Sequence, residues 1–517
     1  MFMILSICLT SLGLPGGLSE MTIDSAMSVA GMKGLVAMEG FLISQMENYT
    51  AALKNKIDLL ESFLQEVQSK REISRSNPRE FVAHPLNAFS LIRRLHEDWT
   101  QSELLMLNQV GLEHLESIKN VLDEAQPTDM DLNDAINGII ALQQFYNLQP
   151  GDIANGLLLG QQYNASLSTL DCQALANACM NTNFDKYALN WYKTAVEHYN
   201  DDRDGQVYRE VFGFKLPDLY INYTSALISK GFEGTAWNLL RDVSDIDATL
   251  WSLRKAVYDV RKIGIPDPTF PITPWIDVAG CQRVWPTRQH QSCHYEKNTS
   301  DFLRIAPLKV ETLSVKPHIV LYHDVIYDSE ISKVKNISLP SLRSPSRILR
   351  AEDHNLKLAK IREDPRSPLS LRIKDMTGED VEEDTDLQIE NYGICGFRFY
   401  HNDNLESQDQ TAKLGDRLTS ILFFMNDVAL GGAFVFLNAN LTIFPQKGSA
   451  LVWRNLDHSL QPKEDLLQHL SCPVIVGSKW TLVKWLHERP QMFSRPCTNN
   501  RKLKAHNQSM KLKALNK

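Results

Sequence analysis

The sequence predicts a multidomain α+β protein, in which two helical regions precede a C-terminal domain of β-strands. Between Leu42 and Val67, apolar residues recur at steps of three and four, the pattern of an amphipathic helix. The stretch 128–263 reads again as helical, with small residues at fixed places among large ones. From Pro317 onward, short β-rich runs alternate with Gly-rich turns, which favours a sandwich or jelly roll.

Length and charge limit the class of protein. A chain of 517 residues can form two to four domains, and its net charge of −8 gives no reason to expect nucleic acid. The tail 498–517 is basic, and we interpret it as a solvated end rather than a binding arm. No segment after the N-terminus approaches the ~20 apolar residues needed to cross a bilayer, so we expect no membrane span.

The first 19 residues read as a secretory signal peptide, because an apolar run from Phe2 to Leu14 precedes small residues. A buried N-terminal helix is the alternative. Seven glycosylation sequons fit the secretory route, and they begin at Asn48, Asn164, Asn222, Asn298, Asn336, Asn440 and Asn507. We therefore expect a soluble glycoprotein that is lumenal or secreted, in a compartment that permits disulfides.

Residues 20–126 are expected to form a helical dimerisation region. The apolar stripe between Leu42 and Val67 could serve as a coiled-coil seam, or it could pack on its own domain. Ser74 to Pro78 interrupts the pattern, further helices follow from Phe81 to about Glu124, and Gln126 to Thr128 reads as a linker.

Residues 128–263 contain two segments with a shared register. Their matching positions, offset by 48, are Ala178, Phe184, Ala188 and Tyr192 against Ala226, Phe232, Ala236 and Leu240. This spacing resembles tetratricopeptide repeats, with Asn200 to Pro217 as an insertion. Two such helix pairs would form a concave surface suited to an extended peptide, although an ordinary helical bundle remains the alternative.

Residues 264–316 read as a linker, and residues 317–497 as the β-rich domain. Within the linker, Cys281 and Cys293 bracket a short polar loop, so a local disulfide is expected. The expected strands are Ile319–Tyr322, Leu418–Met425, Ala433–Leu437, Ala450–Trp453, Val474–Val476 and Trp480–Leu486.

His401, Asp403 and His469 are the candidate metal ligands. A His-x-Asp pair on a strand places an imidazole and a carboxylate on one face, and a second histidine can arrive from a neighbouring strand. Two histidines and one carboxylate leave open positions on Fe(II), as in non-haem iron oxygenases.

Lys479 offers a cation for a dicarboxylate cosubstrate. By period-two alternation it shares a face of the last strand with Trp485 and His487. A buried lysine without an anion is costly, which favours a ligand there, whereas an edge-strand lysine with its ammonium in water is the alternative. Arg417 could point into the same cavity or cap a surface strand.

These motifs resemble the catalytic domain of collagen prolyl 4-hydroxylase alpha subunits. The matching segments are Asn391–Asp403 with Arg417, Phe423–Val428, Gly431–Ala433, Lys447–Gly448, Cys472–Trp480, Lys484–Arg489 and Arg495–Cys497. In addition, Phe81–Phe89 looks like the N-terminal helical domain of the family, so the likeness covers nearly the whole chain.

The resemblance implies a double-stranded β-helix (jelly roll) dioxygenase that uses Fe(II), 2-oxoglutarate, O₂ and ascorbate to hydroxylate proline at C4 in collagen-like Pro-Gly repeats. It implies His401, Asp403 and His469 as iron ligands and Lys479 as the partner of the distal 2-oxoglutarate carboxylate. Arg417, Trp485 and His487 match positions along the proline groove.

The resemblance also implies partners and disulfides. It predicts bonds Cys281–Cys293 and Cys472–Cys497. It further predicts an α₂β₂ tetramer with protein disulfide isomerase, which would retain the chain in the endoplasmic reticulum lumen.

The chain departs from the family pattern at several places. Arg398 and Phe434 stand where the family has a tyrosine and a threonine beside 2-oxoglutarate, and Arg350 to Pro368 is shortened. In the repeat region, Ser225 and Ile228 replace tyrosines. Two alternatives therefore stay open: a lumenal peptide-binding subunit with little turnover, or a hydroxylase of another secreted Pro-containing protein.

Overall fold

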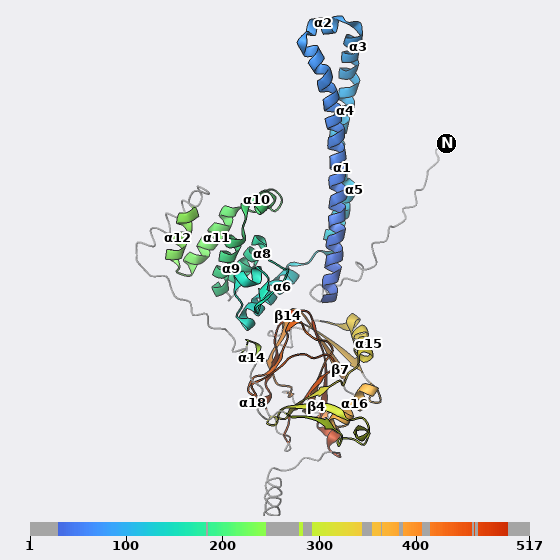
Figure 1. The fold of residues 1–517 in the computed structure, drawn as a ribbon, viewed down its shortest axis with the longest axis vertical. Helices are drawn as coiled ribbons and strands as arrows, with labels where there is room; N and C mark the ends of the chain where they lie inside the picture. The colour runs from blue at the N-terminus through green and yellow to red at the C-terminus, as the bar shows by residue number, and fades with distance from the viewer. Residues whose placement is uncertain are drawn as a thin grey trace, which may run out of the picture. The chain divides into compact units, whose positions relative to one another are not determined.

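In the computed structural model, the chain forms two compact units, residues 1–129 and 130–517 (Figure 1). The structure describes residues 29–494 except for 182–184, 244–278, 283–291, 344–353, 363, 382–385, 406–413, 458–459 and 461–463. The predicted signal peptide, the basic tail and the parts 264–278 and 283–291 of the predicted linker lie outside the described residues. Among the described helices, none is long and apolar enough to span a membrane.

The first unit is a long helix with shorter helices running back along it (Figure 1). Its helices are α1 (Val29–Ser76), α2 (Pro78–Ala83), α3 (Pro85–Arg93), a π-helical turn (Arg94–Asp98), α4 (Trp99–Leu107) and α5 (Leu112–Ala125). The predicted break is present, because α1 ends before Pro78 and Asn77 accepts a hydrogen bond from the Glu80 amide as the cap of α2.

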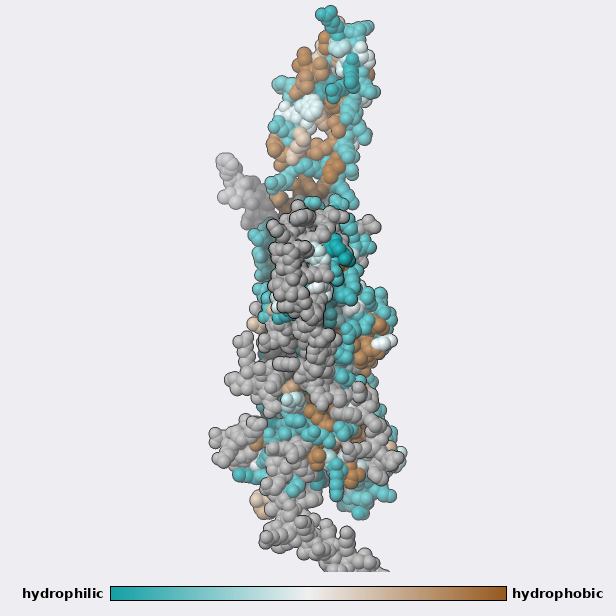
Figure 2. All heavy atoms as spheres, turned by 90° about the vertical axis from the view of Figure 1, so that its left-hand side faces the viewer, coloured by the Kyte–Doolittle hydropathy of each residue, from teal (hydrophilic) through white to brown (hydrophobic). Residues whose placement is uncertain are grey.

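The apolar stripe on α1 is only partly covered. Phe63 packs edge-to-face on Trp99, and Lys56 donates hydrogen bonds to the carbonyls of Met106 and Asn108. Met46 and Ile57, two positions of the expected seam, nevertheless remain 61% and 52% exposed. Figure 2 shows further apolar side chains at the surface of this helical hairpin. The coiled-coil and dimerisation roles remain predictions.

The second unit begins with a layer of helices. They are α6 (Asp129–Tyr146), α7 (Pro150–Ala154), α8 (Thr169–Met180), α9 (Asp185–His198), α10 (Asp201–Glu210), α11 (Leu216–Ser229) and α12 (Glu233–Val243), with a small hairpin of β1 (Leu157–Leu158) and β2 (Gln161–Gln162). The stretch expected as an insertion contains α10. Ala188 and Ala236, from the matched register, are fully buried, which lets neighbouring helices approach closely.

The C-terminal part is an antiparallel sheet system. Its principal sheet has the order β11-β10-β13-β7-β15-β8-β12-β5-β4-β3, with β6 on the side of β7, and β9 pairs separately with β14. The strands are β3 (Ser292–Glu296), β4 (Leu308–Ser314), β5 (Ile319–His323), β6 (His354–Arg362), β7 (Asp386–His401), β8 (Arg417–Phe424), β9 (Leu430–Gly431), β10 (Phe434–Phe436), β11 (Leu441–Ile443), β12 (Ala450–Arg454), β13 (His469–Ser471), β14 (Val474–Val476) and β15 (Lys479–His487). Each strand expected from the sequence is present, within a few residues.

Strand β7 connects two parts of this system. Its first half, through Gln388–Tyr392, pairs with β15, and its end, through Arg398–His401, pairs with β13. Between these halves Cys395 has a φ of +54°, a left-handed conformation that bends the strand. The strands β10, β11 and β13 therefore face β8, β12 and β15, as expected for a jelly roll.

Buried apolar clusters hold these layers together. The inner core lies between the facing strands and includes Phe434 and Phe436 from β10, Trp453 from β12 and Val483 and Trp485 from β15. A second core packs β5, β8 and β15 against α15 (Asp328–Ser338) and α16 (Pro368–Thr377). A third joins the outer face of β10 and β13 to the helical layer.

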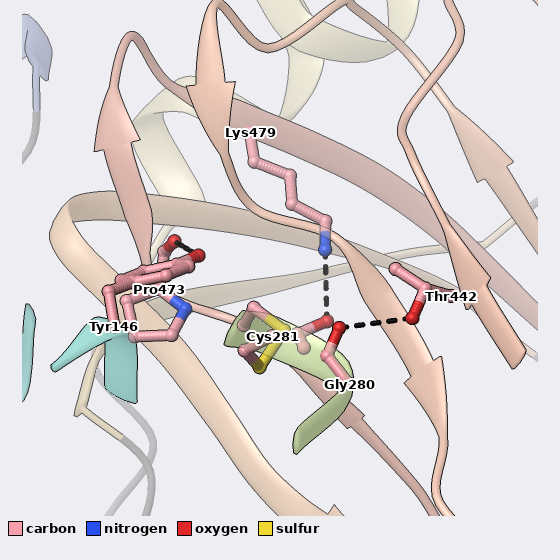
Figure 3. Close-up of a disulfide and its surroundings, with 8 residues drawn as sticks. Tyr146, Gly280, Cys281, Thr442, Pro473 and Lys479 are labelled. Carbon is pink, nitrogen blue, oxygen red and sulfur yellow. Dashed lines mark hydrogen bonds between the residues drawn. A yellow bond between two sulfur atoms is a disulfide. The ribbon is translucent and has the colours of Figure 1, made fainter. Parts of the chain in front are cut away.

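The disulfide differs from both predicted pairs. Cys281, in the short helix α14 (Ala279–Gln282), is bonded to Cys472, and the two Cα atoms are 5.8 Å apart (Figure 3). The predictions of a Cys281–Cys293 bond and of a Cys472–Cys497 bond are therefore wrong, because Cys281 and Cys472 are bonded to each other. Cys293 is an exposed free thiol, and Cys497 lies outside the described residues.

The physical reason is the placement of α14. Thr442 of β11 donates a hydrogen bond to the Gly280 carbonyl at 3.0 Å, which holds Cys281 beside Cys472 (Figure 3). Cys293 lies on β3, at the opposite end of the strand order from β11. Closeness in the sequence therefore did not bring Cys281 and Cys293 together.

Disulfide mapping tests this pairing. We expect a non-reducing digest of the thiol-blocked protein to contain a peptide pair joined through Cys281 and Cys472. The bond should persist in Cys293→Ser, because that thiol is free, and should disappear in Cys472→Ser. Recovery of a peptide pair joined through Cys281 and Cys293 would contradict the structure.

Candidate active site

The predicted metal ligands come together at the junction of β7 and β13. His401 is the last residue of β7 and lies opposite His469, the first residue of β13. Asp403 follows just beyond the end of β7, so the strand carries the histidine but stops before the carboxylate. One ligand atom of each residue lies within 4.8 Å of the others, and all three side chains are buried.

Hydrogen bonds set the tautomer of both histidines. His401 Nδ1 lies 2.8 Å from the Phe399 carbonyl, and His469 Nδ1 lies 2.8 Å from the Leu467 carbonyl. Because a carbonyl oxygen only accepts, each Nδ1 carries the proton and each Nε2 keeps its lone pair. Nε2 is then the atom available to a metal, and the backbone fixes the ring orientation.

Asp403 is held as a carboxylate by its surroundings. Burial opposes ionisation, but His469, Arg417 and the Ser420 hydroxyl lower the pKa of Asp403 below its ordinary value. Ser420 Oγ donates to Asp403 Oδ2 at 2.5 Å, and Asn455 Nδ2 donates to Ser420 Oγ at 2.8 Å. These two hydrogen bonds occupy Oδ2 of Asp403. Its other oxygen, Oδ1, lies 3.9 Å from His469 Nε2 and is available to a metal.

Aromatic rings enclose His469. The rings of Phe434, Phe436 and Trp453 have centroids 5.0, 5.6 and 5.1 Å from the imidazole centroid, with Phe434 stacked on it. Burial lowers the pKa of His469, although Asp403 opposes this shift. The rings therefore keep the imidazole neutral and in a dry environment.

Lys479 lies inside the protein rather than at an edge. Its side chain is 0% exposed, on β15 between β7 and β8, which excludes the reading of an edge-strand lysine with its ammonium in water. Its Nζ donates to Ser471 Oγ at 3.0 Å, the hydrogen bond drawn from Lys479 in Figure 3. Nζ also lies 4.9 Å from the Tyr392 ring centroid. Burial lowers its pKa to about 7, although the Glu390 carboxylate opposes this.

Sequence reasoning missed Glu390, a 1% exposed carboxylate on β7 behind Lys479. It accepts hydrogen bonds from four side chains at 2.8 to 2.9 Å, namely Gln388, Tyr392, Arg398 and Thr481. No signal in the sequence marked it, because Leu387 and Ile389 alternate with Gln388 and Glu390, a pattern that places Glu390 on a polar face of the strand. The Arg398 partner could not be read from spacing alone.

Arg417 contacts both Asp403 and Trp485. The Arg417 guanidinium stacks 3.8 Å over the Trp485 ring and donates to the Asp403 carbonyl oxygen at 3.2 Å. Arg417 Nε and Trp485 Nε1 are buried and make no hydrogen bond within the described residues. His487 pairs in register with Arg417 and is partly exposed. Arg417 therefore points toward the site rather than capping a surface strand.

The donor set fits a non-haem Fe(II) ion. Two neutral imidazole nitrogens and one carboxylate oxygen converge, a ligand set that leaves positions on the metal open. Lys479 provides a buried cation nearby for an acidic cosubstrate. The arrangement is suited to oxidative chemistry on a substrate held beside the metal.

Family models match both ends of the chain. Residues 28–160 match the N-terminal region of the prolyl 4-hydroxylase alpha subunit, and residues 387–487 match the 2-oxoglutarate and Fe(II) oxygenase superfamily. The second match contains every predicted site residue.

Curated relatives align along nearly the whole chain. Prolyl 4-hydroxylase subunit alpha-2 of Gallus gallus is 29% identical over 91% of this chain and 94% of its own. Subunit alpha-1 of Homo sapiens is 28% identical, covering 91% and 95%, and subunit alpha-1 of Caenorhabditis elegans is 28% identical, covering 92% and 90%.

Among solved structures, viral collagen prolyl hydroxylase from Paramecium bursaria Chlorella virus-1 aligns with 32% of this chain and 94% of its own, at 17% identity and a TM-score of 0.27. The assignment rests on the two family models and on the relatives that align from end to end. The chain therefore matches the N-terminal region of the prolyl 4-hydroxylase alpha subunit and the 2-oxoglutarate and Fe(II) oxygenase superfamily, and along nearly its whole length it is similar to prolyl 4-hydroxylase alpha subunits.

Proposed function

We propose that this chain is the catalytic alpha subunit of a prolyl 4-hydroxylase that acts on collagen-like Pro-Gly sequences. The observation that carries the proposal is the buried cluster of His401, Asp403 and His469, with Lys479 buried on the neighbouring strand. The family matches name the same class of enzyme.

His401 Nε2, His469 Nε2 and Asp403 Oδ1 would hold Fe(II), and Lys479 would bind the distal carboxylate of 2-oxoglutarate. When bound, Fe(II) and 2-oxoglutarate supply the oxidising chemistry, in which O₂ delivers one oxygen atom to prolyl C4 and the other to succinate, with release of CO₂. The protein orients both groups and excludes water through Phe434 and Trp453, whose rings pack around His469.

The proline would lie on the side of Arg417, Trp485 and His487. There the buried Arg417 Nε and Trp485 Nε1 are donors that a peptide carbonyl can satisfy. A peptide continuing beyond the site would bind the tetratricopeptide-like helices within 128–263.

The remaining parts of the proposal follow the family resemblance. They are an α₂β₂ tetramer with protein disulfide isomerase, dimerisation through residues 20–126, retention in the endoplasmic reticulum lumen and ascorbate as a reductant. The exposed apolar side chains of the α1–α5 hairpin supply a surface for dimerisation.

One feature favours a second candidate, a peptide-binding subunit with little turnover. Phe434 presents a ring 5.8 Å from Lys479 Nζ, where the family resemblance places a threonine hydroxyl. A ring cannot donate a hydrogen bond to a carboxylate, so cosubstrate binding would be weaker by about tenfold for that bond.

Metal binding tests the role of the Ser420 hydrogen bond. We expect Ser420→Ala to weaken Fe(II) binding by about 10- to 100-fold, because Asp403 Oδ2 loses the donor that orients it. Anaerobic equilibrium dialysis measures this. Ser338→Ala is the control, because Ser338 is equally buried and donates to the Lys335 carbonyl. Equal affinity in the two variants would contradict the role.

Turnover tests the proposed activity. The chain, co-expressed with protein disulfide isomerase and supplied with Fe(II) and ascorbate, should form succinate from 2-oxoglutarate when a (Pro-Pro-Gly)ₙ peptide is present. His401→Ala should abolish this. Turnover without peptide stimulation would indicate another substrate. No turnover in a folded complex would contradict the enzymatic proposal and favour the second candidate, a peptide-binding subunit with little turnover.

The pH dependence of 2-oxoglutarate binding tests the role of Lys479. Its pKa of about 7 means that the cosubstrate-free protein loses this charge as the pH rises through 7. Because the carboxylate binds the protonated form, Kd should be flat below about pH 7 and rise about tenfold per pH unit above it.

Calorimetry in buffers of different ionisation enthalpy measures both the affinity and the accompanying proton uptake. Lys479→Arg keeps its charge throughout the range and should remove the pH dependence. A wild-type Kd that stays constant above pH 7 would be evidence against a carboxylate on Lys479.

A further inference from the structure

The side chains behind Lys479 form a buried charge network. Glu390 and Tyr392 alternate on one face of β7 and lie opposite Thr481 and Lys479 of β15 in register. Glu390 is therefore the diagonal neighbour of Lys479, and its carboxylate acts on the lysine charge. Two buried charges of opposite sign on neighbouring strands attract each other more strongly in a dry interior than in water.

Arg398 supplies a second cation to the same carboxylate. Arg398 Nη1 lies 2.8 Å from Glu390 Oε1, and the Arg398 side chain is 23% exposed whereas Glu390 is 1% exposed. The other three donors to Glu390, from Gln388, Tyr392 and Thr481, are neutral groups. Glu390 therefore forms a direct ion pair with Arg398, while Lys479 Nζ donates a hydrogen bond to Ser471.

The charges of this network have a simple sum. Lys479 and Arg398 contribute two positive charges and Glu390 contributes one negative charge, which leaves a single positive charge. One carboxylate of an incoming ligand would neutralise it. Without Arg398, the lysine and Glu390 would neutralise each other, and a carboxylate ligand would enter as a second anion opposite one cation.

We propose that Arg398 is a positioning residue that neutralises Glu390 and thereby leaves the Lys479 ammonium for the distal carboxylate of 2-oxoglutarate. This inference rests on the proposed function, because it deepens the account of the cosubstrate site. It also explains a departure from the family pattern, since an arginine in place of the expected tyrosine adds a charge that Glu390 offsets. Arg398 and Glu390 then act as a unit.

A double-mutant cycle tests the inference. The variants are Arg398→Gln, Glu390→Gln and the double variant, and the readout is the calorimetric Kd of 2-oxoglutarate for anaerobic Fe(II)-loaded protein without peptide. We expect Arg398→Gln to weaken binding by about 30-fold or more, because Glu390 then competes for Lys479. The double variant should bind within about threefold of wild type, since both charges are removed together.

Two controls separate this role from a structural one. Arg398→Lys keeps the positive charge and should retain affinity to within about fivefold. In addition, 2-oxobutyrate, which has the keto acid but no distal carboxylate, should bind wild type and Arg398→Gln equally. A fold defect would weaken both ligands, and circular dichroism with the Fe(II) affinity checks the folded state.

The inference is overturned if Arg398→Gln binds 2-oxoglutarate as wild type does. It is also overturned if the double variant is as weak as Arg398→Gln, because Arg398 would then contact the ligand itself. Failure of the proposed function looks different: wild type would not bind 2-oxoglutarate, or Lys479→Ala would bind it equally well.

Discussion

Strand β7 pairs with β15 along its first half and with β13 at its end, so one continuous segment belongs to both facing layers of the domain. Between the two halves lies Cys395, whose left-handed φ of +54° interrupts the regular strand. The residues that the site uses from β7 come from both sides of this position. Glu390 and Tyr392 lie before it, next to the buried lysine, and His401 lies after it, opposite His469.

The interior around the site is unusual because it buries charge beside a dense aromatic core. Lys479, Glu390 and Asp403 are at most 4% exposed, in a region that also contains Phe434 and Trp453. Such charges are tolerated only when they are paired and hydrogen-bonded. Asp403 has Ser420, and Glu390 has four donors, so the carboxylates are satisfied by the protein itself. Lys479 has one hydroxyl partner and a lowered pKa, which is the property expected of a cation that awaits an anion.

The helical layer of the second unit is joined to the oxygenase fold through a shared core. Phe145 of α6 packs on Phe397 of β7 with ring centroids 4.7 Å apart, and the Tyr146 hydroxyl donates to the Pro473 carbonyl at 2.6 Å (Figure 3). Pro473 follows Cys472, whose disulfide fastens α14 to the same region. The helical layer is thus packed directly on the part of the sheet that carries His469.

The sequence alone was enough to predict the two helical regions, the strand-rich domain and the candidate metal ligands His401, Asp403 and His469, because apolar periodicity and ligand type are local properties of the chain. It also indicated Lys479, since a lysine within an apolar strand implies a buried cation. Only the tertiary structure decided which cysteine Cys281 joins, because that choice depends on how α14 packs against β11. The same holds for the pairing of Arg398 with Glu390. Eight residues separate them along a bent strand, and only the path of that strand brings their charges to 2.8 Å.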